Sequence, residues 1–579
     1  MQARFGKKCL KRVHDQQGQI TVFLALLFLV LISFCFFIIQ GVQSYSVSAL
    51  GEDAIKNAGE NVLANYDREL FKRYHLFFLD PREKTYLLSD GKATVNQYFS
   101  KESFFSIYCD SLEITEERNV LDEDGLYLKH EIREWMKYRE QQKTEDLLKK
   151  LIENVKKSDI GRQQYQKEEQ DAQADLTKKE AESEKTGEFS EYAGDRKDNE
   201  AGSEQKGENK EKNPAESGKA ESESKAEDEN SGNQKEQNKQ MEQEETVSPE
   251  VQQERITWKE IKETLQLLMK TGILFYVSDK PEQLSKRTIS GENLPSRGNE
   301  DTGSGSGKDQ NSIDKVGKLS LSGLKGIKSL FSVDFSVNKN TALWTKENYI
   351  VPYIEECFWT YGDTLKKNSA NQNNAGKRSN EEKVLFYETE YLINGKSSDL
   401  ENLKSTANYI LLLRFINNYG FTGRDTGIKA QIDTMASALA GVLGMPQTTK
   451  GIQMLIRAAV SYGESLLEVH TLFAGGEIPL IKDKSNWNLE LKTMVRQLKE
   501  KRLVKKGKQN VSYKDYLKML LFIRGSSKTL CYRMMDIMQE NITCKEPGFL
   551  MKDCLFSYKW KGRLSMGTIK MNFVKQNSY

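Results

Sequence analysis

ITVFLALLFLVLISFCFFII, at residues 20–39, decides how this 579-residue chain is organised. The stretch contains no charged residue, no Gly and no Pro. In a helix, about 20 apolar residues that each rise about 1.5 Å match the roughly 30 Å hydrocarbon core of a bilayer. A core helix of a soluble protein would show a polar face over this length, and this stretch has none. It therefore predicts a transmembrane helix.

The charges on either side of the span predict its orientation. Residues 40–60 contain three acidic residues, Glu52, Asp53 and Glu60, and one basic residue, Lys56. The residues before the span are basic, with Arg4, Lys7, Lys8, Lys11 and Arg12. Because basic flanks remain in the cytoplasm, residues 1–19 are predicted to be a cytoplasmic stub. The bulk of the chain is then predicted to be extracytoplasmic and held at the cell membrane by a single pass.

Two alternative interpretations of this N-terminus stay open. The first is a cleaved secretory signal with a small-residue site at Val47-Ser48-Ala49. Its apolar run would exceed the roughly 7–15 residues that such signals use. The second is prepilin processing after Gly18, but Phe23 stands where prepilins carry Glu at the fifth helix position. We expect an uncleaved span.

Composition separates the parts of the chain that can form a core from those that cannot. Lys and Arg total 86 against 84 Asp and Glu, so the net charge of +2 indicates no nucleic-acid partner. Residues 163–254 are mostly Glu, Lys, Gln, Asn, Ser and Gly, which bury too little apolar area to offset chain entropy. We predict a disordered insertion at residues 161–254. Residues 291–315, with GSGSG, predict a flexible linker. Residues 366–382 predict a second flexible linker.

Hydrophobic periodicity predicts the elements between these gaps. Apolar residues at three- and four-residue steps (Val47, Leu50, Ala54, Ala58, Val62) predict that the span continues as an amphipathic stalk helix within residues 40–80. Further helices are predicted over residues 126–156 and from Trp258 to Gly272. Alternating patterns predict strands at residues 104–115, 384–393, 555–560 and 568–573, and residues 74–80 a strand-like entry into the folded domain.

Three successive helices are predicted as hairpins within residues 398–475. The first opens at a capping box, Ser398 with Glu401, the second ends at Pro446, and the third ends at Gly475-Gly476. We expect these helices to form the densest core, with Leu411 and Leu439 buried. Another capping box, Ser512 with Asp515, opens a later helix. Together with the strands, these helices predict an α+β extracytoplasmic domain over residues 81–160, 255–290 and 316–579.

The seven cysteines show no metal-binding spacing. One interpretation is that those beyond the span are buried apolar thiols. The alternative is one local disulfide among Cys531, Cys544 and Cys554.

We predict no catalytic, cofactor-binding or metal-binding residue. The four histidines, His14, His75, His130 and His470, form no HExxH motif. Asp122-Glu123-Asp124-Gly125 lacks the remaining ligands of a calcium loop and predicts a turn.

Two pairs of acidic residues and one basic loop are the remaining candidates for a catalytic or binding site. Glu464 and Glu468 are one helical turn apart, and Glu388 and Glu390 would share one strand face. Paired carboxylates serve glycoside hydrolysis when their pKa values differ, although solvated or ion-paired acids explain the same pattern. Residues 499–508, KEKRLVKKGK, could bind anionic wall polymer or lipid headgroups, with a solvated loop as the alternative.

Several short segments, taken in order, resemble the DUF5702 group of Gram-positive bacteria. They are GQITVFL at residues 18–24, NYDREL at 65–70 with 74–80, YETEYLI at 387–393 with Gly395-Lys396, Glu464-Ser465 with Pro479-Leu480, and YKDYL at 513–517. The resemblance runs nearly end to end, with His75 standing where Gly is expected. It implies an N-terminal architecture like that of TadE/TadG-type pseudopilins, found with tight-adherence (Tad/Flp-type) pilus components. It implies no activity.

We therefore expect a non-enzymatic structural or assembly component of a Tad-like pilus or secretion apparatus, with pilus-apparatus or pseudopilin proteins as partners. The alternative is a cell-wall-binding or adhesive module, in which the basic loop and the polar insertion would be the working parts. A wall-acting hydrolase is a third interpretation and rests on the paired acids alone.

Overall fold

The computed structural model divides the chain into residues 1–169 with 257–579 as one compact unit and residues 170–256 as another. It describes residues 3–101, 106–139, 149–150, 153, 156–157, 159–174, 258–291, 293–298, 331, 343, 346–369, 383–442 and 449–579. The larger unit combines many helices with a three-stranded and a two-stranded antiparallel sheet, which confirms the predicted α+β class.

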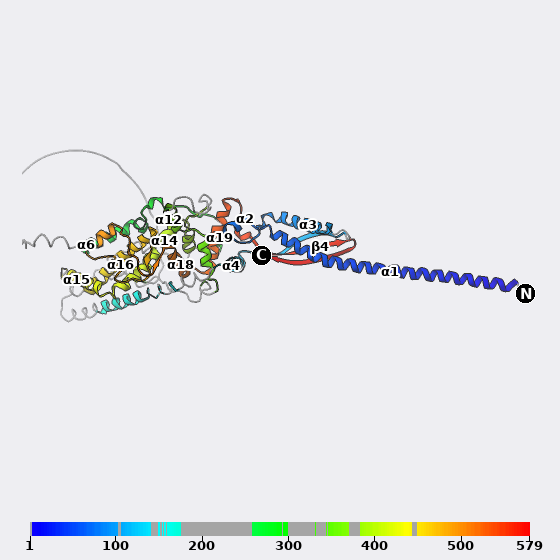
Figure 1. Cartoon of the computed structure of the whole chain (residues 1–579), viewed down its shortest axis with the longest axis horizontal. Helices are drawn as coiled ribbons and strands as arrows, with labels where there is room; N and C mark the ends of the chain where they lie inside the picture. The colour runs from blue at the N-terminus through cyan, green and yellow to red at the C-terminus, as the bar shows by residue number, and fades with distance from the viewer. Residues whose placement is uncertain are drawn as a thin grey trace, which may run out of the picture. The chain divides into compact units, whose positions relative to one another are not determined.

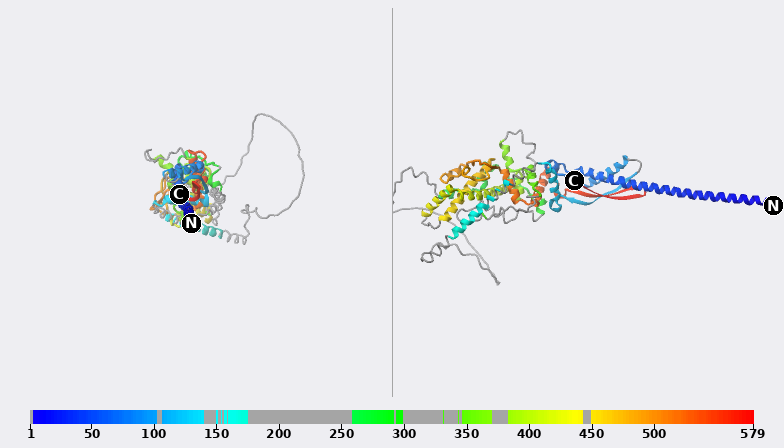
Figure 2. Two further views of the ribbon diagram at one scale, coloured as in Figure 1. Left: turned by 90° about the vertical axis from the view of Figure 1, so that its right-hand side faces the viewer. Right: turned by 60° about the horizontal axis from the view of Figure 1, so that its bottom comes forward.

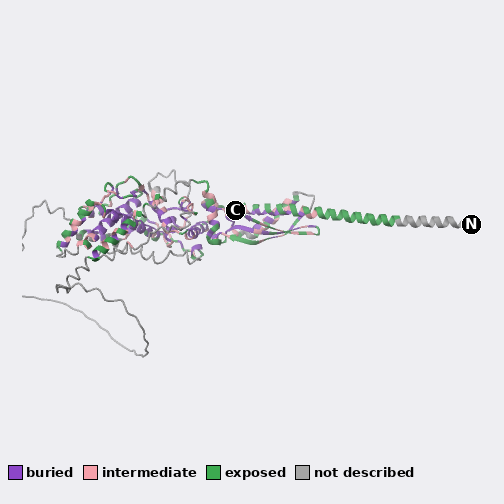
Figure 3. Cartoon of the chain, turned by 90° about the horizontal axis from the view of Figure 1, so that it is seen from below, coloured by how far each residue is buried: buried purple, intermediate pink, exposed green. Residues whose placement is uncertain are grey.

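One long helix, α1 (Ala3–Leu63), contains both the predicted span and the predicted stalk (Figure 1). Its residues 20–42 are exposed, and the part from Ile20 to Leu63 is long and apolar enough to cross a membrane. Figure 3 shows this exposed stretch in green. Beyond it, Val47, Ala54, Ala58 and Val62 are buried, as the stripe predicts. The stalk is shorter than predicted because α1 ends at Leu63, and a second helix, α2 (Arg68–Tyr74), starts after the capping residue Asp67.

The second half of α1 packs on the three-stranded sheet together with α3 (Lys84–Lys101) (Figure 2). The strand order is β1-β4-β5, with β1 (Tyr108–Asn119), β4 (Leu555–Met566) and β5 (Ile569–Ser578). Gly562 allows the close contact, since a Cβ there would clash with Ile55 Cδ1 on α1. The core of this sheet module therefore joins segments from opposite ends of the sequence.

The remaining helices form a helical body around α14 (Asp399–Thr422), which is buried on nearly every side. Its neighbours are α7 (Ile273–Val277), α13 (Glu388–Asn394), α16 (Thr449–Phe473) and α18 (Tyr513–Arg524). The other elements are α4 (Asp122–Met136), α6 (Trp258–Thr271), α11 (Ile350–Cys357), α12 (Tyr361–Ser369), α15 (Thr426–Val442), α17 (Met494–Lys499), α19 (Ser527–Thr543), β2 (Ile478–Pro479), β3 (Asn510–Val511), η1 (Pro81–Glu83), η2 (Pro281–Gln283), η3 (Pro295–Gly298) and η6 (Met551–Asp553).

The three predicted hairpin helices are α14, α15 and α16, but they are not equally buried. Leu411 on α14 is fully buried, as predicted. Helix α15 packs on α16 and leaves most of its own surface exposed, so Leu439 is only half-buried. The prediction of a dense core therefore holds for α14 and α16 and is wrong for the outer face of α15.

Two predicted elements have the wrong type or length. The strand at residues 384–393 is instead the helix α13, whose residues are all buried, so an alternating pattern there marks no exposed face. Gly395, in the left-handed conformation with φ 66°, ends α13 and forms no hairpin turn. The helix predicted over residues 126–156 starts at Asp122 with three left-handed residues and stops at Met136, before a turn.

The predicted insertion and linker are partly folded at their edges. Residues 159–174 are helical, which corrects the disorder predicted from residue 161, and Gly161 packs directly against Ile416 of α14. Residues 293–298 also belong to the fold, since Ser296 N donates to Asp536 Oδ1 of α19 at 2.9 Å. Residues 175–257, 299–330 and 370–382 lie outside the described part of the chain. Cys531, Cys544 and Cys554 are free thiols, two of them buried.

Candidate functional site

Glu464 and Glu468 lie on one face of α16, as predicted, but they join helices together. Glu468 accepts hydrogen bonds from Arg414 Nε at 2.7 Å, Arg414 Nη2 at 2.6 Å and Lys482 Nζ at 2.8 Å. Glu464 accepts from Lys482 Nζ and from Leu489 N at 3.0 Å. Both carboxylates are completely buried. Burial by itself raises the pKa of Glu468, but the charges of Arg414 and Lys482 outweigh it and lower this pKa to about 2.

This geometry does not support the paired acids as a hydrolytic centre. A general acid in such a pair needs a raised pKa, and Glu468 has the opposite shift. The four-residue cluster Arg414–Glu468–Lys482–Glu464 instead connects α14, α16 and the segment that follows β2.

Glu388 and Glu390 do not act as a pair either, because two residues separated by one on a helix point to different neighbours. Glu388 accepts from Trp359 N at 2.8 Å and Asn541 Nδ2 at 2.7 Å. Glu390 accepts from Tyr361 N at 2.9 Å and Tyr513 Oη at 2.8 Å. Burial raises the pKa of Glu390 to about 8, so this carboxyl group is protonated at neutral pH.

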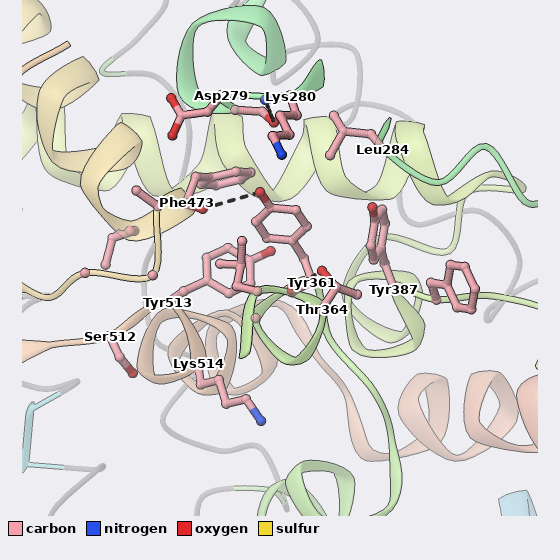
Figure 4. Close-up of a pocket in the computed structure, with 18 of the residues that line it drawn as sticks. Asp279, Lys280, Leu284, Tyr361, Thr364, Tyr387, Phe473, Ser512, Tyr513 and Lys514 are labelled. Carbon is pink, nitrogen blue, oxygen red and sulfur yellow. Dashed lines mark hydrogen bonds between the residues drawn. The ribbon is translucent and has the colours of Figure 1, made fainter. Parts of the chain in front are cut away.

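The contacts of Glu390 lead to a cavity of about 1160 Å³ in the helical body (Figure 4). Its walls come from five segments: residues 278–285, 359–365, 386–387, 472–477 and 512–514. Six of the lining residues are aromatic: Trp359, Tyr361, Phe386, Tyr387, Phe473 and Tyr513. Since these segments are scattered over more than 230 positions, no sequence motif could mark the cavity.

Hydrogen bonds between the segments hold the aromatic wall in place. Tyr361 Oη donates to Phe473 O at 3.3 Å, and Ser285 N donates to Tyr387 Oη at 3.0 Å. The rings of Tyr361 and Tyr513 meet edge to face, with centroids 5.7 Å apart. Burial raises the pKa of Tyr361 to about 12, so its phenol is neutral. The cavity is therefore preformed and walled by neutral rings.

The rim of the cavity carries charged groups, most of which have partners. Asp279 Oδ1 lies 3.1 Å from His470 Nε2, and Glu477 lies 3.2 Å from Lys506 Nζ. Lys514 forms an ion pair with Asp363. The fourth charge is Lys280, which is exposed, and Figure 4 shows its ammonium group directed toward the ring of Tyr361. Within the described residues, the structure shows no ion pair for Lys280.

The other candidates from the sequence are held in separate contacts. His75 stacks on Trp135 with ring centroids 4.0 Å apart, His130 lies beside Glu131, and His470 contacts Asp279. The side chain of His14 lies outside the described part of the structure. Residues 122–125 form the predicted turn, with left-handed Glu123, Asp124 and Gly125.

One further acidic cluster, Asp67 with Asp80 and Glu546, has the spacing of a metal site. Arg82 binds Asp80, and its Nη2 lies 2.8 Å from Glu546 Oε2. This guanidinium supplies the positive charge that the cluster needs, so the structure gives no reason to place a metal there.

The basic loop at residues 499–508 has a fixed backbone. Val504 N donates to Thr471 Oγ1 at 3.1 Å, and Lys505 N donates to Asn488 Oδ1 at 2.9 Å. Lys499, Lys505 and Lys508 are exposed along it. The loop therefore presents several cations on an ordered scaffold.

Comparison with known proteins finds one family. The model of the family described as a "Family of unknown function (DUF5702)" matches residues 251–566. The match covers most of the helical body and β4, and it leaves α1, β1 and β5 outside. No curated protein and no solved structure matches the chain.

Proposed function

Since this chain belongs to the DUF5702 family, whose function is unknown, we propose from its architecture that it is a non-enzymatic structural or assembly component of a Tad-like pilus or secretion apparatus. In this proposal the chain is a single-pass protein of the cell membrane in a Gram-positive bacterium. Its N-terminus is cytoplasmic, and the sheet module and helical body lie outside.

The observation that best supports the proposal is that α1 has an exposed apolar part and a buried part. Residues 20–42 expose apolar side chains, whereas the continuation of the same helix is buried in the sheet module. A helix without a break between these parts couples a membrane span mechanically to the folded domain. The exposed part is free to pack beside the apolar helices of pseudopilin-like partners, where small residues such as Ala25 and Ser33 permit close approach.

A span-replacement experiment tests this mechanism. Residues 20–39 are replaced by an unrelated Leu/Ala span of the same length, which keeps the anchor and removes the specific helix surface. We expect the variant to remain in the membrane fraction and to lose pilus components in pull-downs from detergent extract. Retention of those components at the wild-type level would contradict side-by-side helix packing.

The second candidate function is a wall-binding module, which the ordered basic loop favours. Clustered Lys and Arg side chains bind polyanions, and the fixed backbone lowers the entropy cost of presenting them. The test compares Lys499, Lys505 and Lys508, all changed to Glu, with the same change at Lys561, Arg563 and Lys570 on the outer face of the sheet. Only the loop variant should lose binding to purified anionic wall polymer. Equal loss in both variants would indicate nonspecific attraction.

The third interpretation, a wall-acting hydrolase, receives no support from the contacts of Glu464 and Glu468. Turnover of purified wall that is lost in Glu464→Gln would be needed to restore it.

A further inference from the structure

The cavity in the helical body has a chemically mixed lining. Aromatic residues form part of its wall, and the hydroxyl-bearing residues Ser278, Ser285, Thr364 and Ser512 also line it. Three of these hydroxyls already donate within the protein: Ser285 Oγ to Asp399 Oδ2, Thr364 Oγ1 to Tyr361 O and Ser512 Oγ to Asp515 Oδ2. Their oxygens can still accept a hydrogen bond from a ligand hydroxyl, which an acyl chain does not supply. A carbohydrate suits both kinds of wall, because its ring faces carry C–H groups and its edges carry hydroxyls.

Lys280 places a positive charge at the mouth of the cavity. Asp279, Glu477 and Lys514 each contact a partner described above, whereas the described residues supply no ion pair for Lys280. Its ammonium group lies at the mouth of the cavity, whose walls shield a bound anion from part of the surrounding water and salt. The cavity therefore favours a ligand with an acidic group.

We propose that this cavity binds an acidic oligosaccharide, with its carboxylate or phosphate at Lys280 and its sugar rings along Tyr361, Tyr387 and Phe386. The site is independent of α1 and does not rest on the proposed assembly function. It would give the outer domain a glycan ligand while the membrane helix engages protein partners.

Binding is tested on the full chain in detergent micelles by calorimetric titration. The probes are tetrasaccharides of hyaluronan and polygalacturonate, which are acidic, and of chitin and cellulose, which are neutral. We expect at least one acidic probe to bind saturably and more tightly than both neutral ones. The proposal is overturned if no acidic probe binds, or if the neutral probes bind as tightly.

Two matched pairs of variants locate the site. Lys280→Gln should weaken acidic-probe binding about tenfold or more, the usual effect of losing a charged hydrogen bond. Lys286→Gln, which changes another exposed lysine outside the cavity lining, should change it less than twofold. Equal affinities in these two variants would overturn the role of Lys280.

The second pair fills the cavity. Thr364 on α12 and Thr434 on α15 each donate a hydroxyl hydrogen bond to a carbonyl of the preceding helical turn. Thr364→Trp should abolish binding because the indole occupies the cavity, and Thr434→Trp should leave it intact. If Thr364→Trp lowers the melting temperature, the lysine pair still decides the question. Undiminished binding by a folded Thr364→Trp variant would place the ligand elsewhere.

Discussion

Glu390 and Glu468 are both fully buried glutamates, yet their partners give them opposite ionisation states. Burial raises the pKa of Glu390 to about 8, whereas Arg414 and Lys482 overcome the effect of burial and lower that of Glu468 to about 2. The same isosteric substitution should therefore have different effects at the two positions. Glu390→Gln keeps a neutral acceptor and avoids the cost of holding a carboxyl group protonated, so at pH 7 it should not destabilise the folded chain and should raise the free energy of unfolding. Glu468→Gln leaves buried cations uncompensated and should cost about 3–5 kcal/mol. Urea unfolding measures both, and equal costs would contradict the assignment.

The raised pKa of Glu390 also predicts how stability depends on pH. Between the unfolded value of 4.5 and the folded value of about 8, the folded chain holds a proton that the unfolded chain releases. The contribution of Glu390 to stability is therefore greatest below pH 4.5 and is lost as the pH rises toward 8. At about 1.4 kcal/mol per pKa unit, the loss is on the order of 5 kcal/mol. Melting temperatures at pH 5.5 and pH 8.5 should differ less for Glu390→Gln than for the wild type. The exposed Glu401→Gln is the control and should behave like the wild type.

Leu411 and Leu439 were both predicted to be buried, but only Leu411 is fully buried. Leu411→Ala should cost about 2–5 kcal/mol because the side chain is fully buried in α14. Leu439→Ala should cost clearly less, about 1 kcal/mol, because α15 leaves this side chain half-exposed. Lys505→Ala in the basic loop serves as the reference and should stay within about 0.5 kcal/mol. Similar losses at Leu411 and Leu439, measured by urea unfolding, would mean that α15 is covered in solution.

At the level of elements, sequence patterns succeeded where one face of an element is buried and the other is exposed. The stripe on α1 is such a case. Capping signals also succeeded because they are local: Ser398 Oγ accepts from Glu401 N at the start of α14, and Ser512 with Asp515 forms a capping box at the start of α18. The patterns failed at α13, where every side chain is buried and alternation carries no information about a face.

The cavity could not be predicted for a related reason. Its walls are short stretches from five separate segments, and the packing of α12, α16 and α18 helps to bring them together.

The helical edge of the insertion gives a prediction about deletions. Within residues 159–169, Tyr165 stacks on Phe331 with centroids 4.1 Å apart, and Glu168 accepts from Tyr419 Oη at 2.7 Å. Deleting residues 175–254 should therefore leave the melting temperature within a few degrees, because that tract is predicted to contribute little buried apolar area. Deleting residues 163–254 also removes Tyr165 and Glu168 and should lower it further. Equal melting temperatures would show that the contacts of Tyr165 and Glu168 add nothing to stability.

For the molecule as a whole, the first question is the side of the membrane on which the folded domain lies. Ser48 is exposed on α1 beyond the span, so Ser48→Cys, in a chain without its native cysteines, offers a labelling site. We expect an impermeant thiol reagent to label it in intact cells because the basic flank stays in the cytoplasm. Labelling only after lysis would reverse the topology. A mature N-terminus at Leu50 would show that the apolar segment is removed.

The pairing of β1 with β4 has a consequence for how the protein is made. Thr115 and Lys559, which meet in this sheet, are 444 residues apart in sequence. At about 5–20 residues per second, a ribosome needs roughly 20–90 s to travel from one to the other. Throughout that interval the apolar stripe of α1 lacks strands β4 and β5, which cover it in the folded chain. The first helix to be made is therefore among the last to receive its full cover, because two of the three strands of its sheet module come from the final 25 residues of the chain.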